Sequence, residues 1–171
     1  MSNQSDFSKS MERIFEKVIA DIERVGWSVI YVGPGDEEPA FSYTVGLAAN
    51  GRPDVFMIGL PSNLSMALLN QCASNLLKKD VDTSDRALVE EVAQTPLAFR
   101  EDADGLVEGL ASVRRRVLQN LNLEDVGFVQ LVVPDPNGKF PWDDGCDQSY
   151  ISLQSPYAFS RSSSAQSDRP H

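Results

Sequence analysis

The stretch over residues 127–142, GFVQLVVPDPNGKFPW, constrains the fold more than any other part of the chain. Its first half is a continuous apolar run, which is typical of a strand that is covered on both faces inside a sheet. Pro134 ends the run because proline cannot donate a ladder hydrogen bond. The Asn-Gly pair that follows suits a turn with positive φ, and the chain returns through Phe140 and Trp142 on either side of a proline. We therefore expect an interior strand over residues 126–133 and a turn that brings two rings back onto the sheet.

Three earlier segments also have the pattern of strands, over residues 26–32, 41–47 and 54–60. The first is apolar at both parities, so both of its faces should be covered. The second, FSYTVGL, alternates cleanly, with one side formed by Phe41, Tyr43 and Val45 and the other by Ser42, Thr44 and Gly46. An Asn-Gly pair at 50–51 favours a hairpin between the second and third strands. Shorter strands are expected near 87–89, 96–99 and 150–153, although residues 87–89 could equally form a helical turn, because Leu88, Val89 and Val92 also fit helical spacing.

Helical spacing of apolar residues predicts three helices. The first covers residues 7–25 and either packs on the sheet or pairs with a second copy of the chain as a homodimer. The second covers residues 62–79 and carries Cys72 on its apolar stripe, which indicates a buried, inert thiol. The third begins at Asp104. Its arginines at 114–116 fan around the helix by about 100° each, so they form a solvated face, or one or two of them hold an anion.

Together these elements predict a single α+β domain over residues 7–159. Its sheet should be largely antiparallel, with an N-terminal helix and two further helices packed on it, and split-barrel-like closure is an alternative. Residues 1–6 and 160–171 are polar and are expected to be disordered.

The charge of the chain excludes several functions. Fifteen basic and 25 acidic side chains give a formal net charge of −10, which argues against binding to nucleic acid or to an anionic membrane surface. No apolar run approaches the roughly 20 residues that span a bilayer, and the polar N-terminal residues lead us to expect no secretory signal. With only two cysteines, we expect a cytoplasmic, reduced protein whose partner is a small molecule or another protein.

Histidine limits the chemistry further, because the only one is the final residue, His171. A Ser-His-Asp or Cys-His arrangement and a structural zinc site are therefore not expected, which favours a binding protein over an enzyme. An acidic cluster around Cys146 could bind a hard cation, although turn caps explain it more simply and the spacing is not that of an EF-hand. The cluster consists of Asp135, Asp143, Asp144 and Asp147. No cofactor can be named from the sequence.

These observations predict a ligand pocket between the strand over 41–47 and the turn over 134–142. Hydroxyl groups and the backbone near a glycine would supply hydrogen bonds, and the aromatic rings would supply stacking. The predicted ligand-binding residues are Ser42, Tyr43, Thr44, Gly46, Phe140 and Trp142. Two alternatives remain open: a flavin- or nucleotide-binding oxidoreductase-like split barrel, and a protein-interaction module that uses the acidic surface.

Four segments in this order also resemble a bacterial family, domain-of-unknown-function family 4262, over roughly residues 20–145. The family pattern has a Gly-Trp strand, an aromatic-Tyr-Thr-(Val/Ile)-Gly-Leu strand, a Gly-Leu-Pro before a helix and a closing Gln-Leu-Val-x-Pro-Asp-x-x-Gly-x-Phe-Pro-Trp. The matching segments here are 26–27, 41–47, 59–61 and 130–142. Val25 stands where the family pattern has His, so any chemistry of that His is absent from this chain. The resemblance implies no reaction.

Overall fold

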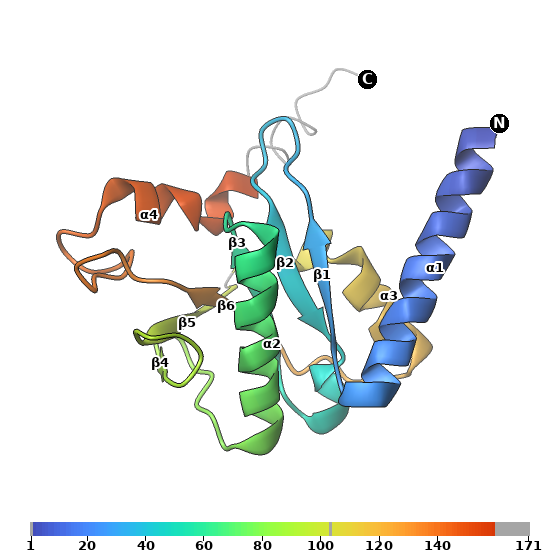
Figure 1. Cartoon of the computed structure of the whole chain (residues 1–171), viewed down its shortest axis with the longest axis horizontal. Helices are drawn as coiled ribbons and strands as arrows, with labels where there is room; N and C mark the ends of the chain where they lie inside the picture. Colours follow the sequence, from blue (N-terminus) through green and yellow to red (C-terminus); the bar gives the residue numbers. More distant parts are fainter. Residues whose placement is uncertain (1, 103, 160–171) are drawn as a thin grey trace.

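The chain forms one mixed sheet with helices on both faces (Figure 1). The structure is a computed structural model. It describes residues 2–102 and 104–159, and for residues 2 and 3 it describes the backbone alone. The helices are α1 (Ser2–Val25), α2 (Ser62–Lys78), α3 (Ser112–Asn120) and α4 (Gln148–Leu153), with short 3₁₀ turns η1 (Leu47–Asn50), η2 (Glu108–Leu110) and η3 (Pro156–Phe159). The strands are β1 (Ser28–Val32), β2 (Phe41–Val45), β3 (Asp54–Ile58), β4 (Leu88–Val89), β5 (Leu97–Glu101) and β6 (Phe128–Val132).

The strand order is β1-β2-β3-β6-β5-β4, and every neighbouring pair is antiparallel except β3 and β6. The predicted α+β class is confirmed, as are the interior position of β6 and the antiparallel pairing of β2 with β3. The sheet is open, with β1 and β4 at its edges, so the split-barrel alternative is wrong. Because β1 is an edge strand, it is only partly covered, contrary to the prediction from its apolar sequence.

The two faces of the sheet form separate apolar cores. Helix α2 lies across one face (Figure 1), where Leu69, Cys72 and Leu76 pack against alternate residues of β3, β6 and β5. Helices α1 and α3 cover the other face, where Val18, Val113 and Val117 pack against the remaining residues of β2 and β3. Removing such alternate side chains from water is the main stabilising term for a sheet of this kind.

Three helices differ from the predictions. Helix α1 begins at Ser2 because neither proline nor glycine interrupts residues 2–6, which were expected to be disordered. Helix α3 begins at Ser112, after a loop that contains Gly105 at a φ of +63°. Residues 148–153 form α4 in place of the predicted strand, because the side chain of Asp147 caps the helix by accepting a hydrogen bond from the Ser149 N–H. Residues 160–171 and Met1 lie outside the described residues.

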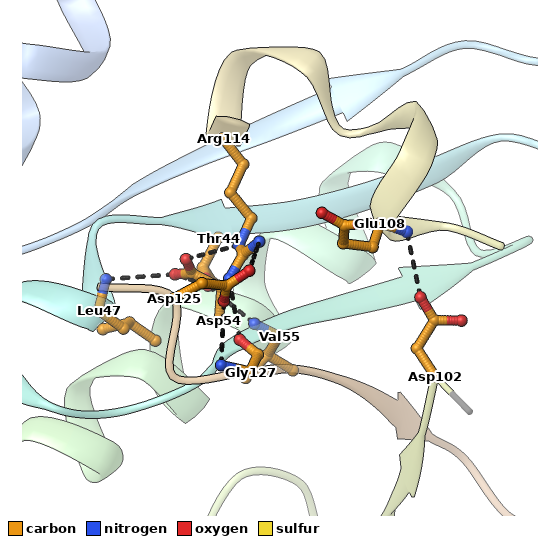
Figure 2. A network of polar contacts seen from close by, with 9 residues as sticks. All are labelled: Thr44, Leu47, Asp54, Val55, Asp102, Glu108, Arg114, Asp125 and Gly127. Carbon is orange, nitrogen blue, oxygen red and sulfur yellow. Dashed lines mark hydrogen bonds and ion pairs between the residues drawn. The ribbon is translucent and has the colours of Figure 1, made fainter. Parts of the chain in front are cut away.

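A cluster of charges around the buried side chains of Arg114 and Asp54 joins α3 to the starts of β3 and β6 (Figure 2). Arg114 is only 1% exposed, and its Nε donates to Oδ2 of Asp54 at 2.9 Å. Its Nη2 donates to Oδ1 of Asp125 at 2.6 Å and to the carbonyl oxygen of Gly127 at 2.9 Å. The other oxygen of Asp54 accepts from the Thr44 hydroxyl and the Leu47 N–H. Arg114 therefore links α3 to the start of β3 and to the segment before β6, and Asp54 extends these contacts to β2 and η1.

The electrostatics of this cluster favour the charged guanidinium. Burial alone would lower the pKa of Arg114, but its hydrogen bond with Asp125 and the charge of Asp54 outweigh burial and raise that pKa. The hydrogen bonds from Arg114 in turn lower the pKa of Asp125. Arg115 and Arg116 are exposed, so the predicted solvated face holds for two of the three arginines and not for Arg114.

Replacing Arg114 should test the contribution of this cluster. We expect Arg114→Met to lower the free energy of unfolding by about 3–5 kcal/mol, because it leaves the buried Asp54 carboxylate without its charged partner. The matched control is Arg115→Met on the same helix, which should change stability by less than about 0.5 kcal/mol. Urea denaturation followed by circular dichroism measures both values. Equal stability of the two variants would show that the cluster does not hold the fold together.

Candidate functional site

The hydroxyl groups of β2 are used inside the protein. Ser42, Tyr43 and Thr44 are each no more than 1% exposed. The hydroxyl groups of Ser42 and Ser65 share a hydrogen bond of 2.8 Å that joins β2 to α2. The Thr44 hydroxyl donates to Asp54 and accepts from the Val55 N–H. These contacts stabilise the sheet and leave the two hydroxyl groups turned toward protein atoms.

Gly46 serves the close approach of a helix. Its φ is +109°, and a Cβ at this position would lie 2.7 Å from Cγ1 of Ile22 on α1 and 3.2 Å from the carbonyl oxygen of Gly26. No side chain other than hydrogen fits that space with that backbone conformation. Of the two roles that the sequence allows for this glycine, packing against another segment is the one that the structure displays.

The aromatic pair lies on the other face of the sheet from Ser42. The rings of Phe140 and Trp142 stack with centroids 5.2 Å apart and an interplanar angle of 6°, and they pack on Ala98 and Val132. Val132 shares a face with Phe128, on the side of α1 and α3, whereas Ser42 contacts α2 on the opposite side. The expectation that rings and hydroxyls border one pocket therefore fails. Alternation along β2 identified its two sides correctly, but it did not reveal which side the distant turn would cover.

Trp142 instead lines a cleft of about 350 Å³ at the exposed end of β5. One side is formed by β5 and the loop before β4, and the other by α4 and the start of η3. Its lining includes the side chains of Asp85, Arg86, Arg100, Trp142, Ile151 and Tyr157. This volume lies at the lower end of the range for small-molecule sites. Of the predicted site residues, Trp142 lines this cleft and Phe140 supports it from behind.

A network of amide hydrogen bonds fixes Arg100 in the cleft. Its Nε donates to Oε1 of Gln130 at 3.0 Å, and its Nη2 donates to the carbonyl oxygen of Gln154 at 2.9 Å. The Gln130 Nε2 donates to the same carbonyl oxygen at 2.6 Å. The side chain of Gln154 then bonds both the N–H and the carbonyl oxygen of Val133, where β6 ends. The segment after α4 is thereby attached to the sheet, and the guanidinium of Arg100 lies 5.8 Å from the Trp142 ring centroid.

Arg86 approaches the same ring from the loop before β4. Its guanidinium carbon lies 5.4 Å from the centroid of Trp142. The residue has a φ of +66°, a left-handed conformation that is uncommon for side chains other than Asn, Asp and Gly. The backbone holds it there, because the Arg86 N–H donates to the carbonyl oxygen of Phe99 at 2.7 Å. Two cations are thus directed to one indole ring by separate elements.

The acidic cluster organises the turn that carries the aromatic pair. Asp135 accepts hydrogen bonds from the backbone N–H groups of Asn137, Lys139 and Asp147, all at 2.9 Å. Asp143 accepts from the Phe140 N–H at 2.9 Å. These contacts lower the pKa of Asp135, with the Asp147 and Lys139 N–H groups as the largest causes. The acids act as turn caps, which is the simpler of the two roles that the sequence suggested.

Thiol and metal chemistry receive little support from the geometry. Burial raises the pKa of Cys72 to about 12, and burial together with Asp135, Asp147 and Asp143 raises the pKa of Cys146. Both thiols therefore stay protonated at neutral pH. Within residues 2–102 and 104–159, no group of three or more His, Cys, Asp or Glu side chains is placed to hold a metal ion. Over the same residues, no helix has the length and apolar content needed to cross a membrane. His171 lies outside these ranges.

Sequence reasoning missed Arg86, Arg100 and Tyr157. Arg100 follows directly on a short apolar segment, and a charged residue at the end of a buried strand was the available signal. Arg86 carries no local signal, because its left-handed backbone depends on pairing with Phe99. Tyr157 belongs to the 3₁₀ turn η3. The contact between Gln154 and Gln130 of β6 positions this turn, and the two glutamines are far apart in the sequence.

Acid should weaken the turn through Asp135. Because its pKa is lower in the folded state than in the unfolded chain, Asp135 contributes stability that is complete above the unfolded value of about 3.9 and is lost as pH falls through the folded value. We expect Asp135→Asn to reduce stability at pH 7 and to flatten the loss of stability between pH 5 and pH 3. Urea denaturation across that range measures the slope. Asp144→Asn, at an exposed position, is the control and should keep the wild-type slope.

The comparison with protein-family models agrees with the sequence resemblance. No curated protein and no solved structure matches the chain. A family model described as Domain of unknown function (DUF4262) matches residues 21–147. This range contains β1 to β6, the acid-capped turn, Arg86, Arg100 and Trp142, and it ends before α4. With most of its length covered by that model, the chain belongs to the DUF4262 family.

Proposed function

We propose that this protein is a small-molecule-binding domain whose site is the Trp142 cleft. The observation that carries the proposal is the convergence of an indole ring, two guanidinium groups and Tyr157 on a cleft of about 350 Å³. Tyr157 is 62% exposed, and Trp142 is half-buried. Aromatic rings with polar groups at their edges are typical of sites that hold flat ligands.

The cleft walls are held by hydrogen bonds within the protein, and this rigidity supports a binding role. Its floor is fixed by Gln130 and Gln154, and its aromatic side is fixed by the Asp135 turn. Such rigid support reduces the entropy that a ligand must overcome on binding. The end of α4 also packs closely on the residue after β3. A Cβ on Gly59 would lie 2.4 Å from the carbonyl oxygen of Leu153, the last residue of α4.

The alternatives gain no comparable support. A flavin- or nucleotide-binding oxidoreductase was suggested by analogy with split barrels, and the open sheet removes that analogy. Interaction with a basic protein through the acidic surface stays a prediction from the net charge of −10. Asp135 and Asp143 accept backbone hydrogen bonds, and the pKa values of the Cys72 and Cys146 thiols are raised.

Nuclear magnetic resonance can test the proposed site without a known ligand. The chain has two tryptophans, and Trp27 donates its indole N–H to Asn70, in contact with the core on the α2 side. We expect at least one of three probes with the same ring, 1-naphthoate, 1-naphthamide and 1-naphthylmethylamine, to shift the indole N–H resonance of Trp142 in a saturable way. The Trp27 resonance should stay in place, because it lies on the other side of the sheet.

Trp142→Phe assigns the two resonances and serves as the matched variant. Phenylalanine keeps a ring that can stack on Phe140, so the variant should fold while any probe binds about tenfold more weakly, given the value of a large aromatic contact. Failure of all three probes to move the Trp142 resonance at millimolar concentration would overturn the proposed site. Equal shifts of both tryptophans would indicate a general effect on the fold.

A further inference from the structure

We infer that the ligand of the Trp142 cleft is a planar anion, a flat ring that carries a carboxylate or another oxyanion, with Arg100 as its charge-recognising residue. The inference rests on the proposed function and adds the chemical class of the ligand. It is carried by the different partners of two arginines that are withdrawn from solvent, Arg114 and Arg100. One of them has carboxylate partners and the other has amide partners.

Arg114 and Arg100 provide an internal comparison. The guanidinium of Arg114 bonds two carboxylates, Asp54 and Asp125. The hydrogen bonds of Arg100 go to the oxygen atoms of Gln130 and Gln154, which are neutral. Among the residues described, no carboxylate forms a hydrogen bond or ion pair with Arg100. Its positive charge is therefore partly desolvated without a bonded counter-ion, an arrangement that is costly unless something negative binds there.

The electrostatics of Arg100 agree with this geometry. Burial lowers the pKa of Arg100; the charges of Asp85 and Tyr157 act in the opposite direction without cancelling burial, and the charge of Arg86 lowers the pKa further. For Arg114 the balance has the opposite sign. A bound carboxylate would restore that balance and could form two parallel hydrogen bonds with a guanidinium.

The acidic residues of the cleft do not fill this role. Asp85 and Glu101 are both exposed, whereas Arg100 is half-buried. One oxygen of Asp85 already accepts from the Glu101 N–H at 3.0 Å, and the other lies 4.0 Å from Nε of Arg86. Asp85 therefore acts on Arg100 only through its charge, which does not outweigh burial. The charge that is buried in the wall is therefore positive.

Arg86 supplies an independent indication. A side chain in the left-handed region costs roughly 1 kcal/mol relative to glycine, and such strain is concentrated at functional sites. Here Arg86, which is exposed and lies 4.0 Å from Asp85, places its guanidinium carbon 5.4 Å from the centroid of the Trp142 ring. Phe140 stacks on one face of the indole, and the guanidinium groups of Arg86 and Arg100 lie over the ring.

The charge series of probes tests the inference in the wild-type protein. The three naphthalene probes share one ring and differ in the charge of one substituent. We expect 1-naphthoate to bind at least about tenfold more tightly than 1-naphthamide, and 1-naphthylmethylamine to bind most weakly, because a charge-assisted pair with arginine is worth a factor of this size. Titration of the Trp142 indole resonance measures the three dissociation constants.

Two variants identify the residue responsible. Arg100→Gln should remove the preference for naphthoate over naphthamide. Arg86→Asn should weaken naphthoate binding several-fold while its Tm stays equal or rises, because asparagine adopts the left-handed conformation at lower cost. A purely structural role for Arg86 predicts the reverse, a lower Tm with unchanged binding. If Arg100→Gln fails to fold, the Arg86→Asn result decides.

The outcomes separate the inference from the proposed function. Binding of naphthamide or naphthylmethylamine as tightly as naphthoate would overturn the anion inference and leave the Trp142 site standing. A naphthoate preference that persists in folded Arg100→Gln, or unchanged naphthoate binding in Arg86→Asn, would also overturn the inference. Failure of every probe to bind would overturn both the site and its ligand class.

Discussion

The buried guanidinium of Arg114 is the contact on which the arrangement of this domain depends. It bonds Asp54 at the start of β3, Asp125 and Gly127 just before β6, and it extends from α3. Strands β3 and β6 form the one parallel pair of the sheet, and parallel neighbours cannot be joined by a short hairpin. A charge cluster at their common end therefore sets the register of the two strands and the position of α3 together.

Arginine occurs in two different environments in this fold, at Arg114 and at Arg100. Arg114 is enclosed and compensated by carboxylates, which makes it a structural element. Arg100 lies on β5, is held in place by glutamine oxygens and faces a cleft. Fixed geometry together with an uncompensated charge is the combination that recognition requires. The distinction depends on the partners of each guanidinium, since both are withdrawn from solvent.

Local patterns in the sequence predicted most of the sheet. The apolar run ending at Pro134 identified β6 as interior, and the Asn-Gly pair identified the β2–β3 connection. The sequence could not show that Arg114 is buried, because its partner Asp54 lies 60 residues away and helical spacing favours exposure for two of three adjacent arginines. Residues 148–153 were assigned to a strand because their apolar pattern is short and ambiguous, and the deciding contact is the cap from Asp147.

The candidate site was predicted only in part, for a physical reason. Alternation identifies the two sides of a strand, and the sequence does not state which side a distant turn will cover. Phe140 and Trp142 were therefore expected beside Ser42, whereas Val132 and Ala98 hold them on the opposite face. Trp142 remains in the site. The polar groups around it come from β5 and from the loop before β4, which no periodic pattern connects to the turn.

The two sides of the Trp142 cleft come from different parts of the chain. The indole and both arginines fall inside the family-matched range, whereas Ile151, Ser155 and Tyr157 lie after it. That outer side is attached chiefly through Gln154 and the close approach at Gly59. Replacing these contacts would therefore alter the outer side of the cleft while β5, β6 and the acid-capped turn keep their own hydrogen bonds.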